Sequence, residues 1–209
     1  MRIFLSLSLF LIFWGCSPVE KSSLVKSGSS GVKPTGWESP FQGFFEKSLF
    51  RTTLDIRDYH LTGYTLIKKS ADTSIRIVFA NDMGMTLYDV EFVREKFIIH
   101  YVFEPMKKNA LLSILESDFR ALFFYTVEAQ GLTNYTEKAS GIPLVYQPRD
   151  KRYYYYDPKT LHITAIAGGS NRWNNFRITF DYPKGTFVQN ILITNPGIKL
   201  SLRLGWISQ

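Results

Sequence analysis

Few side chains in this chain of 209 residues are arranged for acid–base or metal chemistry. The histidines are His60, His100 and His162, and none has a second metal-binding side chain beside it at ligand spacing, which predicts no metal site. The sequence has no G-x-S-x-G nucleophile motif, and the glycines of "AGGSN" (167–171) precede no expected helix that could hold a phosphate. We therefore expect no enzyme, no catalytic residue and no cofactor.

The most reactive side chain is the only cysteine, Cys16, which follows an apolar stretch. Arg2 is the only charge before Glu20, and residues 3–14 are mostly apolar, fewer than the ~20 residues that span a bilayer. A basic start, a short apolar run and a small residue before a cleavage point are typical of a secretory signal peptide. A lone thiol cannot form an internal disulfide in the oxidising compartment that such a signal leads to. The pattern predicts a signal peptide at 1–15.

The residues around the cysteine, "LIFWGCSPVE" (11–20), resemble the lipobox of bacterial lipoproteins, whose cysteine is lipidated and becomes the first mature residue. Phe13 departs from the leucine that the family prefers three places before the cysteine. The resemblance implies several acyl chains on Cys16, enough to hold the protein on a membrane. Ser17 in place of aspartate implies the outer membrane, and we expect the periplasmic side. An ordinary cleaved signal, or an uncleaved anchor with an unmodified thiol, stays open.

The charge and composition then divide the rest of the chain. Removal of residues 1–15 takes away one arginine and leaves 24 basic against 18 acidic residues, a net charge of +6 in place of +7. The positive net charge favours attraction to an anionic membrane surface. Because the basic residues are dispersed along the chain, we expect no nucleic-acid partner. Residues 16–37 are rich in Ser, Gly, Lys and Pro and predict a flexible tether. Residues 38–209 are expected to form a single domain.

Most of that domain alternates apolar and polar residues with a period of two, which predicts β-strands with one dry face. In "KFIIHYVFE" (96–104) this pattern places Phe97, Ile99, Tyr101 and Phe103 on one side. The same alternation occurs in "TSIRIVFA" (73–80), "MTLYDVEFV" (85–93), "NNFRITFDY" (174–182) and "IKLSLRLGW" (198–206). A hairpin loop is expected at "NDMG" (81–84).

Residues 105–125 break the strand pattern, because their apolar side chains recur at helical spacing. This stretch predicts one amphipathic helix, with Pro105 near its start. A set of antiparallel strands with one or two helices is an α+β fold that is mostly β.

The order of these elements resembles that of lipoprotein carriers of the LolA/LolB type over roughly residues 45–207. The quoted stretches are "GYTLIKKSADTSIRIVFANDMGMTLYDVEFVREKFIIHYV" (63–102), "LESDFRALF" (115–123) and "ILITNPGIKLSLRLGWI" (191–207). The resemblance implies an incomplete antiparallel β-barrel of about nine to eleven strands around one to three lid helices. It also implies acyl chains or a lipoprotein as cargo and a periplasmic carrier protein as a partner.

An open barrel whose inner strand faces are apolar can enclose a hydrophobic cavity for acyl chains, although such faces more often form a packed core. The candidate lining residues lie on three of the expected strands and on the helix. They are Ile75, Ile77, Phe79, Tyr88, Val90, Phe92, Phe97, Ile99 and Phe103, with Leu111, Leu115 and Phe119 as the lid.

Two hypotheses follow. The first is an outer-membrane-anchored lipoprotein that binds acyl chains or a lipidated partner in this cavity during lipid or lipoprotein trafficking. The alternative is a structural or adaptor envelope lipoprotein with a solid core and a protein partner. "YYYY" (153–156) offers stacking contacts to a glycan, but tyrosines in a strand more often alternate between core and surface. An enzyme acting on lipid or glycan has no converging acid–base pair to support it.

Overall fold

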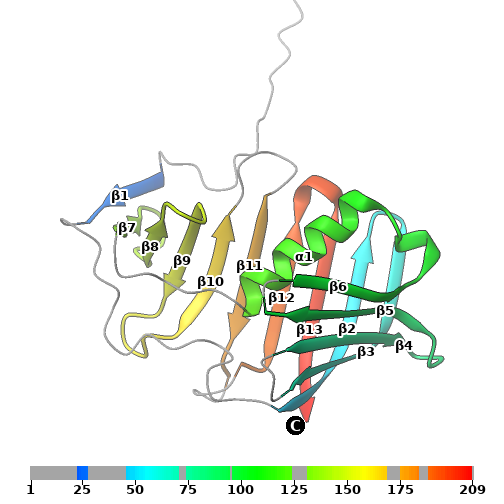
Figure 1. Ribbon diagram of the computed structural model, residues 1–209. Coiled ribbons are helices and arrows are strands. Elements are labelled where there is room, and N and C mark those ends of the chain that lie inside the picture. Colours follow the sequence, from blue (N-terminus) through cyan, green and yellow to red (C-terminus); the bar gives the residue numbers. More distant parts are fainter. Residues whose placement is uncertain are drawn as a thin grey trace, which may run out of the picture.

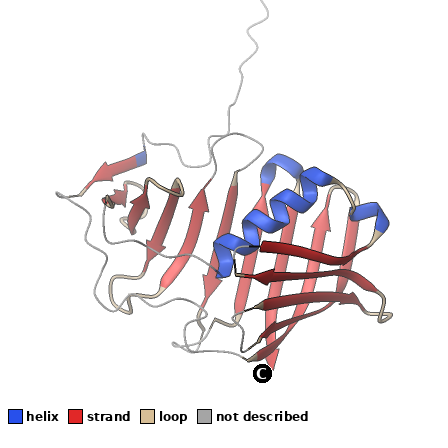
Figure 2. Ribbon diagram, in the orientation of Figure 1, coloured by secondary structure: helices blue, strands red, loops and turns tan. Residues whose placement is uncertain are grey.

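A computed structural model describes residues 23–27, 46–70, 74–94, 96–123, 131–168, 175–183 and 188–208. The described chain forms one antiparallel sheet with a single α-helix against one of its faces (Figures 1 and 2). The predicted signal peptide, Cys16 and most of the predicted tether lie outside the described residues. Among the residues that the structure describes, no helix is long and apolar enough to cross a membrane.

The sheet has thirteen strands, and their order in space follows two meanders. The strands run in the order β1-β7-β8-β9-β10-β11-β12-β13-β2-β3-β4-β5-β6, so the last strand of the chain lies beside the first long one. The strands are β1 (Leu24–Lys26), β2 (Lys47–Ile56), β3 (Tyr59–Lys69), β4 (Ile75–Asn81), β5 (Thr86–Val93), β6 (Lys96–Val102), β7 (Thr133–Glu137), β8 (Pro143–Gln147), β9 (Arg152–Tyr156), β10 (Ile163–Gly168), β11 (Phe176–Asp181), β12 (Asn190–Asn195) and β13 (Leu200–Ser208).

One α-helix, α1 (Asn109–Phe123), follows a 3-10 turn at Glu104–Met106, and a second 3-10 turn at Pro196–Ile198 precedes β13. The helix contacts β11 and, through Phe119, also Tyr88 of β5. These two strands are six places apart in the sheet order, about 29 Å in a flat sheet. A helix is only about 10–12 Å wide, so the sheet must bend around it. The predicted α+β fold, an incomplete antiparallel barrel around a helix, is confirmed.

The number of strands exceeds the predicted nine to eleven, partly because the predicted tether contributes one. Leu24 of β1 pairs with Glu137 of β7, and the Ser27 N–H donates to the Asn134 carbonyl at 3.0 Å. The expectation of a flexible tether at 16–37 is therefore wrong for residues 24–26. Composition did not indicate this strand, because its two apolar residues stand between serine-rich stretches. Leu24 packs against a small apolar cluster on the face of the sheet that points away from α1.

The predicted alternation holds along most strands and fails in β6. The pairing of β5 with β6 shifts at a bulge, so that Asp89 lies opposite Tyr101 and Val90 opposite Ile99, which leaves His100 as the extra residue. Tyr101 is consequently 46% exposed, and Val102 takes the place opposite the buried Tyr88. The prediction that Phe97, Ile99, Tyr101 and Phe103 share one face is therefore wrong at Tyr101.

The core lies between α1 and the face of the sheet that carries it, which we call the inner face. The helix buries the side chains that its spacing predicted, and each such side chain contributes about 1.5–3 kcal/mol. They are Leu111, Ile114, Leu115, Phe119 and Leu122.

A smaller cluster on the outer face contains Leu144, Tyr155, Ala165 and Ala167. The guanidinium of Arg177 lies 4.7 Å from the centre of the Tyr155 ring, a cation–π contact. Tyr154, one residue earlier, belongs to the inner core. The tyrosine run is thus divided between the two faces of β9, as expected for strand residues.

Candidate functional site

The space between α1 and the inner face is the candidate site, and aromatic rings join its two walls. The ring centroids of Phe79 and Tyr88, on β4 and β5, are 5.4 Å apart. Tyr88 lies 6.0 Å from Phe119 of α1, and Phe119 lies 6.3 Å from Phe123. Tilted and stacked rings at these separations attract one another beyond the area that they bury. The contact between Phe119 and Tyr88 therefore packs α1 against β5, near the end of the meander formed by β2–β6.

Eleven of the twelve predicted lining residues belong to this interface. Nine lie in the core cluster, and Phe97 and Phe103 pack against it. Ile77, Phe79 and Phe92 are 0% exposed. A side chain that lined a void large enough for water would expose area to that void, so the space beside these three is filled. The nine in the core cluster are Ile75, Ile77, Phe79, Tyr88, Val90, Phe92, Leu111, Leu115 and Phe119.

Ile99 is placed differently from the other eleven. It lies opposite Val90 on β6, an edge of the sheet, and is 44% exposed. The ligand-binding role of all twelve residues stays a prediction. For Ile77, Phe79 and Phe92 it requires that α1 move away from the sheet, because no volume is free beside them in this conformation.

One pocket does open at the first turn of α1, with a volume of about 70 Å³. It is bounded by the β2–β3 turn, the two 3-10 turns and the start of the helix. A water molecule takes about 30 Å³ of liquid, so this volume holds two or three groups of that size. Its lining residues are Ile56, Arg57, Tyr59, Leu61, Phe103, Pro105, Met106, Lys108, Ala110, Leu111 and Ile198.

Long-range pairing assembles this pocket. Leu200 of β13 lies opposite Ile56 of β2, and the Arg57 N–H donates to the Lys199 carbonyl at 3.1 Å. Arg57 and Lys199 both have positive φ, near 52°, a conformation that non-glycine residues adopt only in tight turns. Only Phe103 and Leu111 of the pocket residues were among the predicted lining residues. The other pocket residues could not be predicted from the sequence, because no local pattern indicates that β2 pairs with β13.

A buried carboxyl lies in the helix–sheet interface. Asp118 of α1 is 2% exposed, and among the described residues its Oδ2 atom has no hydrogen-bond partner. Burial raises the pKa of Asp118 to about 8, and the nearby charge of Arg152 acts against this rise. An ionised carboxylate here is costly unless it finds a partner. Asp118 therefore weakens the hold of α1 on the sheet once it loses its proton.

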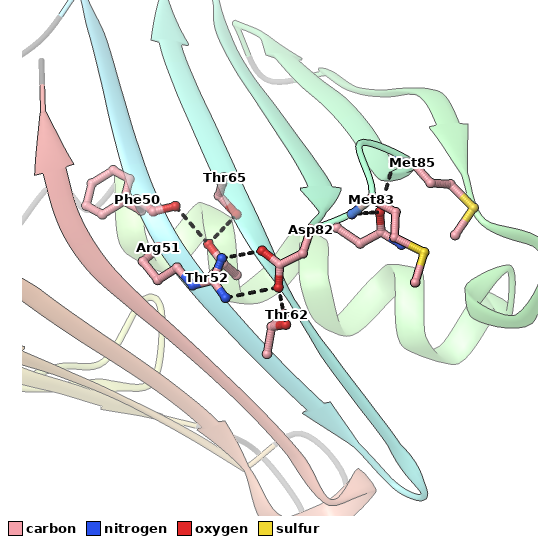
Figure 3. Close-up of polar contacts among 9 residues, drawn as sticks. Phe50, Arg51, Thr52, Thr62, Thr65, Asp82, Met83 and Met85 are labelled. Atoms are coloured by element: carbon pink, nitrogen blue, oxygen red, sulfur yellow. Dashed lines mark hydrogen bonds and ion pairs between the residues drawn. The ribbon is translucent and has the colours of Figure 1, made fainter.

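The Tyr88 hydroxyl is likewise buried without a hydrogen-bond partner among the described residues, whereas two threonine hydroxyls on the inner face are paired. The hydroxyl of Thr52 donates to that of Thr65 at 2.7 Å, between β2 and β3 (Figure 3). Both side chains are fully buried. The pair leaves the wall of β2 and β3 effectively apolar, because each hydroxyl has a partner.

A second feature is the β4–β5 hairpin, whose tip carries exposed methionines. Met83 is 94% exposed and Met85 44%. The side-chain oxygen of Asn81 accepts the backbone N–H of both, at 3.1 and 2.9 Å, and Gly84 supplies the positive φ of the turn. The hairpin thus presents apolar side chains to the surroundings on a defined loop.

Side chains of β2 and β3 brace that hairpin from the outer face (Figure 3). Arg51 forms a two-pronged ion pair with Asp82, and Thr62 donates to the same carboxylate at 2.5 Å. These hydrogen bonds lower the pKa of Asp82 and raise that of Arg51. The Arg51 guanidinium also lies 4.9 Å from the centre of the Tyr64 ring. No local pattern of residues indicates this cluster, because it depends on the register of three strands.

Comparison with known proteins adds a resemblance in fold. No protein-family model and no curated relative matches the chain. Among solved structures, an outer membrane lipoprotein-sorting protein domain from Vibrio parahaemolyticus is similar, with a TM-score of 0.39 and 7% identity over 83% of this chain and 85% of that one. A LolA superfamily protein from Nitrosomonas europaea has a TM-score of 0.36 and 8% identity over 81% and 88%. At these values the similarity carries no argument about the family, ligand or activity of this chain.

Proposed function

We propose that the protein is an envelope lipoprotein, anchored through Cys16, that binds the acyl chain of a lipid or a lipidated partner between α1 and the inner face. The observation that carries this proposal is the pocket at the first turn of α1. Its lining includes Ile56, Met106 and Leu111, which belong to the core cluster between the helix and the strands. Apolar pockets with a few polar groups at the mouth are typical of sites for apolar ligands.

The present volume admits only the end of a chain, so binding requires displacement of α1. Two features favour such a movement. The sheet is open, because the order of the described strands ends at β1 and β6 without closing into a ring. The interface also contains the carboxyl of Asp118, whose Oδ2 atom has no hydrogen-bond partner among the described residues and whose ionisation opposes seating of the helix. An acyl chain would replace the apolar contacts that the helix loses, at about 0.8 kcal/mol per buried methylene.

The test is photocrosslinking of a fatty acid with a diazirine in its tail to the full chain in vesicles. Ala110 is an exposed residue of α1 that lines the pocket, so Ala110→Phe fills the pocket without burying a new group in the core. Ser113, also exposed on α1 and outside the pocket lining, gives the matched control Ser113→Phe. We expect Ala110→Phe to lower crosslinking to residues 103–111 about fivefold or more. Equal yields from the two variants would remove the proposal.

A second candidate function is an adaptor lipoprotein that holds a protein partner. It is favoured by the filled space beside Ile77, Phe79 and Phe92. This second function is tested by crosslinking in cells from position 83, because Met83 lies on the exposed β4–β5 hairpin. A single protein partner together with no lipid in the photocrosslinking experiment would support the adaptor.

A further inference from the structure

We propose that the pocket at the first turn of α1 selects a single-chain phospholipid, with its acyl end in the pocket and its phosphate between Arg57 and Lys108. This proposal rests on the proposed function, because it names the class of amphiphile that the same site would take.

The pocket combines an apolar floor with a basic rim. The floor is formed by Ile56, Leu61, Met106 and Ile198, which belong to the core cluster or pack against it. Arg57 and Lys108 also line the pocket, and both are exposed at its edge. They come from different elements, the β2–β3 turn and the residue before α1. A ligand that touches both must therefore lie across the mouth.

These two cations are not neutralised within the described part of the chain. Neither side chain has an ion pair or hydrogen bond there, although Asp58 follows Arg57 directly. The neighbouring Lys107 differs, because its ammonium lies 3.5 Å from the Glu104 carboxylate. The first turn of α1 contains no acidic residue. The mouth of the pocket thus carries unopposed positive charge beside an apolar floor.

A third basic residue, Lys199, adds to the positive charge at the mouth of the pocket. The backbone hydrogen bond from Arg57 to Lys199 sets the exposed Lys199 beside the same rim. A phosphate has several oxygens and a formal charge of up to two, so it can bond to more than one cation at once. A neutral head group gains nothing from this rim. The charge therefore selects the head group, and the apolar floor selects the tail.

The amount of space favours an amphiphile with one acyl tail. About 70 Å³ admits the end of a single tail and has no room for the ends of two. The occupant that satisfies both the charge and the volume is an amphiphile with one tail and a phosphate.

The experiment uses the full chain in neutral vesicles doped with one of two photoreactive lipids. Lysophosphatidic acid and monoacylglycerol share the glycerol and the diazirine tail and differ in the phosphate. We expect lysophosphatidic acid to label residues 103–111 about tenfold more than monoacylglycerol does. The double variant Arg57→Gln/Lys108→Gln should remove this preference.

Lys68→Gln/Lys69→Gln provides the control, since it removes two exposed lysines of β3 that do not line the pocket and leaves the same net charge. It should keep the preference. A urea titration of each variant shows whether it is folded, and Lys108→Gln alone replaces the double variant if that one unfolds. Loss of the preference in the control as well would mean attraction to the whole basic surface and would overturn the proposal.

The remaining outcomes separate the two proposals. Equal labelling by both lipids overturns the phosphate selection and leaves acyl binding in place. Labelling of residues 103–111 by neither lipid removes both proposals. Displacement of lysophosphatidic acid by inorganic phosphate would assign the rim to free phosphate and overturn the lipid assignment.

Discussion

Replacement of Asp118 by asparagine measures how strongly the buried carboxyl opposes seating of α1. The unfolded chain loses this proton near pH 3.9, whereas the folded chain keeps it up to about pH 8. The folded state therefore binds one more proton between these values, and the free energy of unfolding falls as the pH rises through this window. The contribution is complete below about pH 4 and is lost as the pH passes 8.

The size of the effect follows from the pKa difference. Each pH unit within the window changes the free energy of unfolding by about 1.4 kcal/mol, so about 4 kcal/mol is lost between pH 4 and pH 7. Asparagine has nearly the shape of the protonated aspartate and no ionisation to suppress. We therefore expect the free energy of unfolding of Asp118→Asn, minus that of the natural chain, to rise by about 1.4 kcal/mol per pH unit within this window.

The assay is urea denaturation of both proteins at pH values from about 4.5 to 8.5. Asp58→Asn is the control, because Asp58 is exposed in the β2–β3 turn and its replacement changes the net charge equally. The difference between Asp58→Asn and the natural chain should not depend on pH to a comparable degree. Parallel pH profiles for Asp118→Asn and the natural chain would show that the folded protein holds this carboxylate ionised. The proposed weakness of the helix–sheet contact would then lose its basis.

Three further predictions concern packing, backbone and anchoring. Phe119→Ala removes the ring that bridges Tyr88 and Phe123, and we expect a loss of about 3–5 kcal/mol in the free energy of unfolding, measured with urea. Gly63→Ala would force a Cβ atom against the Ala80 carbonyl and to 2.6 Å from the Asn81 Cα atom, so it should destabilise by more than about 2 kcal/mol. Gly205→Ala, whose Cβ would have its nearest neighbour at 3.5 Å, is the control and should change the melting temperature little. Cys16→Ser should abolish labelling by a radioactive fatty acid and release the protein from membranes on fractionation, and retention of the label would refute lipidation at this residue.

The regular part of the fold could be predicted because its signal is local. Period-two alternation identified strands such as β4, β5 and β11, and helical spacing identified the buried side chains of α1. The pattern failed at His100, since this extra residue in an edge strand moves Tyr101 to the outer face and Val102 to the inner one without changing the composition.

The candidate site was less accessible to prediction, because it depends on which strands meet. Phe79 and Phe119 were predicted to line one cavity, as wall and lid. In the structure each ring contacts that of Tyr88, and Phe79 is 0% exposed. Whether apolar faces enclose a void or interdigitate is decided by packing, which the spacing of residues does not encode. The basic rim of the pocket could not be predicted, because it depends on the contact between the β2–β3 turn and Lys199, which no local pattern indicates.

The position of β13 in the middle of the sheet has a consequence for how the protein matures. Its residues hydrogen-bond to β12 on one side and to β2 on the other, so they are the only link in the strand order between the two meanders. An emerging polypeptide cannot make this connection until residue 200 and beyond have been delivered. A premature stop before Leu200 would leave β12 and β2 without the strand that pairs with both, and such bare edges promote aggregation. The sheet can therefore be completed only after β13 has been synthesised.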